Sequence, residues 1–296
     1  MAYFKSLSIL AFTSLLAIAA HAEPIFFDSF ESGDTSATNN NGFTWDKNNR
    51  TSVVKTKVVE YNDTAQDTVF TSNRNWKSNN AEHSLSFLYE SNESWTEQRF
   101  KIGKPYSEIW MGFWLRVPTN FTHPKTPNAG DNQKLFFLWM DGYSTKGEGS
   151  SVGMEFRGNG RGGSYFYGKI SPGGNRGAGI DKGIASFIEV PKHRGKWMHL
   201  VVHVTSESFV GAKDGLMEVW RKWEGTSEYV KTQDLKNQPI RLSSRVNGFA
   251  NGYLMGWANA VYPVDTEFLI DDFELSTTPL FLHSNAPNSP SGIAIK

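Results

Sequence analysis

The chain is a succession of short segments in which apolar and polar residues alternate, separated by Gly, Asn, Asp and Pro. In 110–117 almost every second residue is apolar, which predicts a strand with one face in a core. The core face carries Met111, Phe113, Leu115 and Val117, and the opposite face carries Trp110, Trp114 and Arg116. Segments 197–204, 216–223 and 268–275 predict further strands.

About a dozen such segments lie between residues 23 and 276, without an internal repeat and with weak helical periodicity. Many short strands in one unit of this length are typical of a sandwich. We therefore predict an all-β fold, a two-sheet antiparallel jelly-roll β-sandwich, in a single domain over 23–276.

Both ends of the chain differ from this pattern. Lys5, the apolar run 7–20 and the small-residue site Ala20-His21-Ala22 predict a signal peptide over 1–22 and a secreted or periplasmic protein. No later stretch reaches the ~20 apolar residues that a membrane span needs, so no membrane span is expected. The segment 277–296, rich in Pro, Asn and Ser, predicts a loose C-terminal tail.

The amino-acid composition excludes several kinds of site and partner. The 30 Lys and Arg residues balance 30 Asp and Glu residues, which argues against a globally basic nucleic-acid-binding protein. Cysteine is absent, which excludes disulfides, Cys-ligated zinc and a thiol nucleophile. Aromatic residues make up 14% of the chain, ample material for one large core.

The most informative stretch is 151–170. It reads as two strands, 151–157 and 164–170, joined by the Gly-rich connection 158–163. If the strands pair antiparallel, their polar faces coincide, because side chains alternate along each strand. The residues that would meet on this face are Glu155, Arg157, Tyr165, Tyr167 and Lys169.

Such a group of cations and phenols suits β-elimination from a uronic-acid polymer. A cation held against the uronate carboxylate stabilises the enolate-like intermediate. Neighbouring cations favour a tyrosine phenolate, so one Tyr can act as base and a second can protonate the leaving oxygen. The alternative is structural: Tyr165 and Tyr167 lie on a half-buried sheet, and Arg157 pairs with Glu155.

Positive charge is concentrated in and beside the Gly-rich segment 158–179. The basic residues are Arg157, Arg161, Lys169 and Arg176. This local excess predicts an anionic polysaccharide partner, with a solvated loop as the alternative. On 110–117, the outward Trp110, Trp114 and Arg116 are candidates for stacking on and hydrogen bonding to sugar rings, unless another segment covers them.

Other candidate sites are weaker. His199 and His203 share a strand face but are about 13 Å apart, too far to bind one metal. Asp28 and the pair Asp271-Asp272 are candidates for structural calcium where the first and last strands meet, although adjacent Asp residues are common in turns. Glu155 has no second carboxylate at glycosidase spacing on its strand face. We predict no catalytic metal or cofactor.

Several segments together resemble polysaccharide lyase family 14, the alginate and glucuronan lyases of the concanavalin A-like jelly-roll superfamily. The resemblance spans about 107–276. It rests on Lys134-Leu135, Gly153-Met154-Glu155-Phe156-Arg157, Tyr165-Phe166-Tyr167, Gly195-Lys196-Trp197, Asp214-Gly215-Leu216-Met217-Glu218-Val219-Trp220 and Phe268-Leu269-Ile270-Asp271-Asp272-Phe273.

The resemblance implies that Lys134 and Arg157 contact the substrate carboxylate and that Tyr165 and Tyr167 supply base and acid. The family usually has Ser where this chain has Glu155. Our first hypothesis is therefore a diverged, monomeric polysaccharide lyase acting on a uronate polymer. The alternatives are a lectin-like module that binds the polymer without cleaving it and a structural envelope protein.

Overall fold

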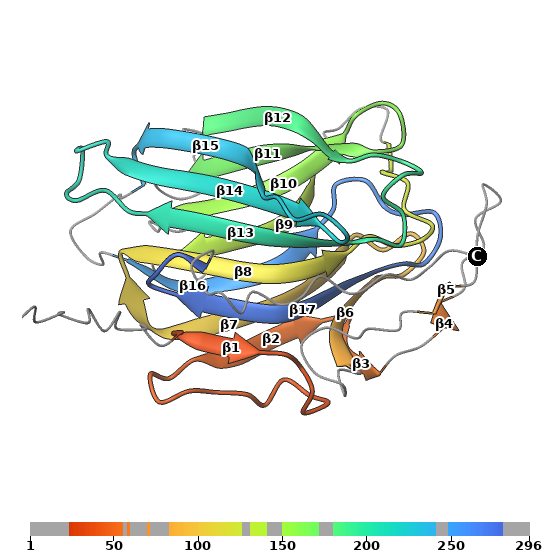
Figure 1. Ribbon diagram of the computed structural model, residues 1–296, viewed down its shortest axis with the longest axis horizontal. Coiled ribbons are helices and arrows are strands. Elements are labelled where there is room, and N and C mark those ends of the chain that lie inside the picture. The colour runs from red at the N-terminus through yellow and green to blue at the C-terminus, as the bar shows by residue number, and fades with distance from the viewer. Residues whose placement is uncertain are drawn as a thin grey trace, which may run out of the picture.

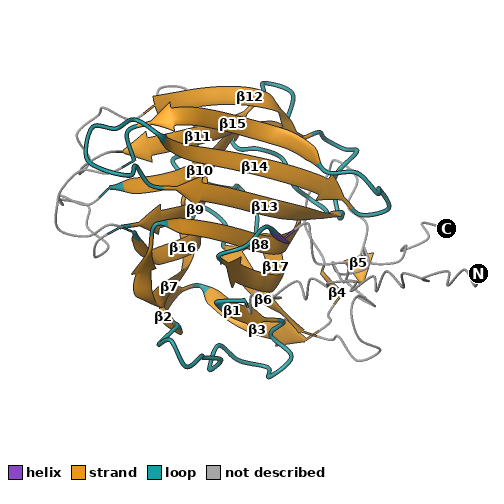
Figure 2. Cartoon of the chain, turned by 60° about the vertical axis from the view of Figure 1, so that its left-hand side comes forward, coloured by secondary structure: helices purple, strands orange, loops and turns teal. Residues whose placement is uncertain are grey.

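A computed structural model describes residues 24–55, 58–59, 70–71, 83–125, 131–140, 150–171, 180–240 and 248–280. The predicted signal peptide and most of the predicted C-terminal tail lie outside these ranges. The described residues form almost only strands, in two antiparallel sheets that face one another (Figures 1 and 2). The predicted fold is confirmed.

The first sheet faces the viewer in Figure 1. In spatial order its strands are β15 (Val230–Gln238), β14 (Gly215–Trp223), β13 (Trp197–Thr205), β8 (Glu108–Arg116), β17 (Thr266–Ser276), β6 (His83–Tyr89) and β3 (Thr51–Lys55), with β1 (Phe26–Asp28) paired to β17. The four segments predicted from alternation as 110–117, 197–204, 216–223 and 268–275 are β8, β13, β14 and β17.

The second sheet lies behind the first. In spatial order its strands are β12 (Ile180–Ile188), β11 (Ser164–Ser171), β10 (Ser151–Gly158), β9 (Gln133–Trp139), β16 (Phe249–Trp257), β7 (Trp95–Tyr106) and β2 (Thr44–Asn49). Two short strands, β4 (Val58–Val59) and β5 (Phe70–Thr71), form a separate pair. The predicted strands 151–157 and 164–170 are β10 and β11.

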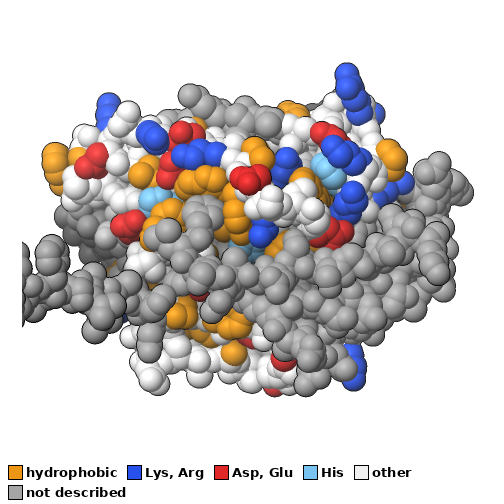
Figure 3. Space-filling view, in the orientation of Figure 1, with side chains coloured by type: hydrophobic (Ala, Val, Ile, Leu, Met, Phe, Trp, Pro, Cys, Tyr) orange, Lys and Arg blue, Asp and Glu red, His pale blue; other side chains and the backbone are white. Residues whose placement is uncertain are grey.

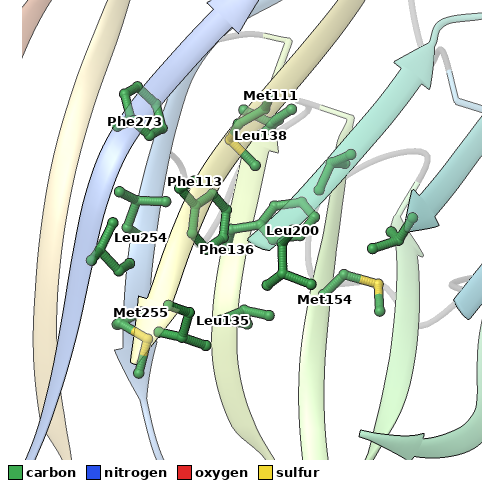
Figure 4. Close-up of a cluster of buried hydrophobic side chains, with 14 of the residues drawn as sticks. Met111, Phe113, Leu135, Phe136, Leu138, Met154, Leu200, Leu254, Met255 and Phe273 are labelled. Carbon is green, nitrogen blue, oxygen red and sulfur yellow. The ribbon is translucent and has the colours of Figure 1, made fainter. Parts of the chain in front are cut away.

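The core lies between the two sheets (Figure 4). Apolar side chains on alternate positions of each strand point into it, because side chains of a strand alternate between the faces of the sheet. They include Met111, Phe113, Phe136, Leu138, Met154, Leu200, Leu254 and Phe273. Each sheet therefore keeps a second, outer face on which other residues lie.

Two features of the described residues bear on the predictions for the ends of the chain. Leu280, in the segment predicted to be a loose tail, is buried against Trp110 and Val201 on the outer face of the first sheet. In the ranges given above, no helix is long and apolar enough to cross a membrane.

Candidate functional site

The polar residues predicted to converge do so on the outer face of the second sheet. β10 and β11 pair antiparallel, with Arg157 opposite Tyr165 and Glu155 opposite Tyr167. Lys169 lies one step further along the same face, opposite Gly153. The intervening Met154 and Phe156 are fully buried in the core. The pairing predicted from alternation alone is therefore confirmed.

Lys134 reaches this face because of an irregularity in β9. The register between β9 and β10 shifts at Leu135, so that Lys134 pairs with Glu155 while Phe136 pairs with Met154. Leu135 and Phe136 are both buried in the core although they are consecutive. A β-bulge of this kind interrupts the alternation of side chains. It places Lys134 on the outer face, whereas strict alternation with Phe136 and Leu138 would direct it inward.

Glu155 is at the centre of the cluster. Its side chain is only 1% exposed, and it lies between Lys134 on one neighbouring strand and Tyr167 on the other. Its carboxylate oxygens lie 3.4 Å from the Arg157 guanidinium and 3.6 Å from the Lys169 ammonium. A buried carboxylate needs such partners, because desolvation strongly disfavours an isolated charge. Glu155 thus holds two of the cations on the face.

The two tyrosines lie beside these cations. The guanidinium carbon of Arg157 is 3.6 Å from the centroid of the Tyr167 ring, a close cation–π contact. The Tyr165 ring lies 6.2 Å from the Tyr167 ring, inclined at 56°. Both side chains are half-buried, with part of their surface open to solvent. Two phenols and a guanidinium therefore lie together on one partly exposed surface.

The ammonium of Lys134 is shifted by its surroundings. Burial lowers the pKa of Lys134 below its ordinary value, and the nearby Lys169 charge lowers it further. The carboxylates of Glu155 and Glu97 oppose this shift. Because desolvation is the largest effect, Lys134 loses its charge at a lower pH than an exposed lysine does.

A pH profile should reveal this shift. Affinity for an anionic sugar should fall as the pH rises through the lowered pKa of Lys134, since the neutral amine no longer attracts the carboxylate. In Lys134→Arg the decline should move to higher pH, because a guanidinium stays charged there. Calorimetric titration over a pH series measures both. Lys192→Arg, which changes a lysine in an exposed ion pair with Glu189, is the control. Identical pH profiles for wild type and Lys134→Arg would contradict a role for the Lys134 charge in binding the anionic sugar.

The central carboxylate should also support the fold. Glu155→Gln removes the charge that holds Arg157 and Lys169, and we expect the free energy of unfolding to fall by about 1–3 kcal/mol. Urea denaturation measures this. Glu90→Gln, which removes one of the two exposed carboxylate partners of Arg50, should cost less than about 1 kcal/mol. A Glu155→Gln variant as stable as wild type would show that desolvation of Glu155 cancels its pairing.

The structure adds residues of β7 that our sequence reasoning missed. Glu97 is buried on the same outer face. Its carboxylate accepts hydrogen bonds from Nε of Arg99 at 2.5 Å and from the Trp95 indole at 3.3 Å. A methyl group at Gly256 would lie 3.3 Å from Cβ of Lys134 and 3.4 Å from Glu97 Oε2, so Glu97 and Lys134 are close. The alternation of Trp95, Glu97 and Arg99 in the sequence was the signal that could have found them.

The described part of this face carries more positive than negative charge. Three carboxylates, those of Asp46, Glu97 and Glu155, are outnumbered by the five cations on the same face, which are Arg99, Lys101, Lys134, Arg157 and Lys169. Arg161 is exposed in the connection between β10 and β11, beyond the strand ends. Arg176 lies outside the described residues. The local positive excess inferred from the sequence therefore includes residues of β7 and β9 as well.

Trp110, Trp114 and Arg116 are not part of this cluster. They lie on β8 in the first sheet and point away from the core, as predicted, but on the opposite side of the sandwich from Arg157. Trp114 and Arg116 are fully buried, and Trp110 is 7% exposed and stacks on His203 at 3.9 Å. Figure 3 shows hydrophobic side chains gathered over this face, with charged ones around them. In this structure, Trp114 and Arg116 offer no surface to a sugar.

His199 and His203 on β13 have different side-chain partners. His199 contacts the Tyr229 hydroxyl at 2.6 Å, and His203 lies between carboxylates of Glu108 and Glu218 at 2.8 and 3.1 Å. Both have side-chain partners, as expected of sheet histidines. In the parts of the chain that the structure describes, no group of three or more His, Asp or Glu residues is placed to hold a metal ion.

Asp28 and Asp271, two of the residues weighed as calcium ligands, point to different sides of the first sheet. Both Asp28 carboxylate oxygens accept hydrogen bonds, from the Phe30 amide and the Trp45 indole on the core side of β1. Asp271 lies on the other face of the sheet, paired with Trp114 and near the Ser84 hydroxyl. Asp28 and Asp271 therefore lie on opposite faces of the first sheet.

Comparison with known proteins gives similarity to solved structures. Alginate lyase Aly36B has a TM-score of 0.49 at 15% identity, over 65% of this chain and 80% of that chain. Alginate lyase vAL-1 from Chlorella virus has a TM-score of 0.44 at 13% identity, over 76% and 91%. The receptor-binding domain of botulinum neurotoxin type G has 0.45 at 10% identity, over 88% and 49%. No family model and no curated protein matches. The resemblance to family 14 stays a prediction.

Proposed function

We propose that this protein is a polysaccharide lyase that cleaves a uronate-containing polymer by β-elimination. The observation that carries the proposal is the convergence of Lys134, Arg157, Tyr165 and Tyr167 on one partly open face. These residues come from three adjacent strands, and the cations lie beside the phenols. This is the arrangement that the elimination requires.

The first requirement is to stabilise negative charge. The proton to be removed lies on the carbon next to a carboxylate, and its removal places a second negative charge on the sugar. Arg157 and Lys134, held against that carboxylate, stabilise the enolate-like intermediate electrostatically. Arg157 can contact both carboxylate oxygens through its planar guanidinium, whereas Lys134 acts as a point charge.

The second requirement is proton transfer. One tyrosine, as phenolate, takes the proton from the carbon next to the carboxylate. The electron pair left behind forms a double bond to the neighbouring carbon, and the glycosidic C–O bond at that neighbour breaks. The second tyrosine donates a proton to the leaving oxygen. Tyr165 and Tyr167 are the phenols placed for these roles, since their rings are 6.2 Å apart beside Arg157.

An absorbance assay tests the proposal. Mature protein is incubated with alginate, glucuronan and glycosaminoglycans, and ultraviolet absorbance of the unsaturated chain ends is followed. We expect turnover on at least one polyuronate. Absence of new unsaturated ends on every polymer, with folded protein, would overturn the lyase function. The proposal includes export, for which the predicted signal peptide over 1–22 is the support.

A second candidate is a lectin-like module that binds the polymer without cleaving it. Glu155 favours it, because this buried carboxylate already engages Arg157, one of the two cations proposed to contact the substrate carboxylate, and also Lys169. The two candidates differ in one measurement. Saturable binding of a polyuronate, seen by calorimetry, without any unsaturated product identifies the binding module.

A further inference from the structure

Two tryptophans are exposed side by side at the end of the second sheet. Trp95 of β7 and Trp257 of β16 are register partners, and they are 36% and 47% exposed. Tryptophan is highly buried on average in folded proteins, so an adjacent exposed pair is unusual. Each ring leaves a large apolar surface open to solvent.

The pair lies on the same face as the cationic cluster. The Trp95 indole donates to Glu97, whose carboxylate lies near Lys134 as described above. Trp257 precedes Ala258, which is buried in the core, so the Trp257 side chain points to the outer face. Ala258 in turn forms a bridge with Gln133, the neighbour of Lys134. From β9 to β7 is two strand spacings, about 10 Å.

We propose that Trp95 and Trp257 form a platform that stacks on a pyranose ring of the polymer, a subsite next to the one at Lys134. The inference rests on the proposed function, because it takes the same polyuronate as its ligand. A pyranose ring has apolar faces of C–H groups and a rim of hydroxyls, which suits an exposed indole. Arg99, 22% exposed on the same face, is placed to meet the carboxylate of a uronate unit there.

Together with the site at Lys134, this subsite defines the direction in which the polysaccharide crosses the sheet. A polymer that lies over β11, β10 and β9 at the cationic cluster continues over β16 to β7, perpendicular to the strands. Longer oligomers should therefore bind more tightly than short ones, because only they reach both subsites. The occupant is a sugar unit of the polymer, and a second copy of this protein is the alternative that the test must separate.

Calorimetry with alginate and glucuronan oligomers of increasing length tests the inference. We expect wild-type affinity to rise with length and Trp257→Ala to lose about tenfold on long oligomers, the scale of a stacking contact, with little change on disaccharides. Trp257→Phe keeps a ring and should keep most of the gain. Phe209→Ala, a 65% exposed aromatic elsewhere, is the matched control.

The outcomes separate the two proposals. Equal affinity of wild type, Trp95→Ala and Trp257→Ala for long oligomers would overturn the platform while leaving the lyase function intact. A Trp257→Ala variant that changes the oligomeric state by light scattering, but not the affinity, would assign the pair to self-association and also overturn it. If wild type binds no polyuronate of any length, the proposed function and this inference both fail.

Discussion

Tyr167→Phe is expected to lower kcat by about 10²- to 10⁴-fold, the range of a lost acid or base, while KM changes little. The substitution removes only the phenolic oxygen. The ring remains, and with it the contact to Arg157, whose guanidinium lies 3.6 Å from the ring centroid. Initial rates from the absorbance of unsaturated ends give kcat and KM separately.

The neighbouring phenol supplies the comparison. Tyr165→Phe should lower kcat by a similar factor if the two hydroxyls act as base and acid. The variant that lacks the acid should regain more of its kcat than the other variant does when the polymer has a better leaving group. Tyr106→Phe, at the far end of β7, is the matched control and should keep full activity. Full activity of both Tyr165→Phe and Tyr167→Phe would remove the tyrosines from the mechanism.

Arg157→Ala should lower kcat by about 10²- to 10³-fold, because it removes a charge aimed at the developing enolate. The loss should also appear as weaker substrate binding, since the carboxylate is charged before and after proton removal. Arg157→Lys retains a charge but not the planar fork, so we expect only partial recovery. Steady-state kinetics and calorimetry on the same polymer separate the two effects.

The arginine prediction needs a structural check. Arg157 also holds the buried Glu155, so its removal changes stability as well as catalysis. Circular dichroism and urea denaturation show whether the variant is folded under assay conditions. Lys192→Ala, which removes an exposed cation, should match wild type in rate. An Arg157→Ala variant that is folded and fully active would contradict the proposed charge stabilisation.

Alternation along the strands was enough to predict much of the fold and part of the site. Glu155 lies opposite Tyr167, and Arg157 opposite Tyr165, because the two strands pair without a register shift. Assigning every second residue on either side of the Gly-rich connection to the same face was therefore correct. The same counting predicted the core of β8. Where strands are regular, sequence periodicity carries over directly to geometry.

Lys134 shows where such counting ends. Its outward position depends on the bulge at Leu135. A bulge interrupts the two-residue alternation of side chains, and no residue near Leu135 in the sequence indicates that a bulge forms there. Trp114 and Arg116 show a second limit. Alternation correctly placed them away from the core, but their burial arises from packing on the outer face of the first sheet, which periodicity does not report.

The order of strands in the second sheet has a consequence for how this protein can diverge. β9, β10 and β11 are consecutive in the chain and adjacent in the sheet, so the four proposed catalytic residues, Lys134, Arg157, Tyr165 and Tyr167, lie within one continuous stretch of sequence. Trp95 and Trp257 come from strands far apart in the chain. Replacement of the segment 133–171 by recombination would therefore exchange the proposed catalytic residues together. Binding of the more distant sugar units would have to change by separate substitutions in β7 and β16.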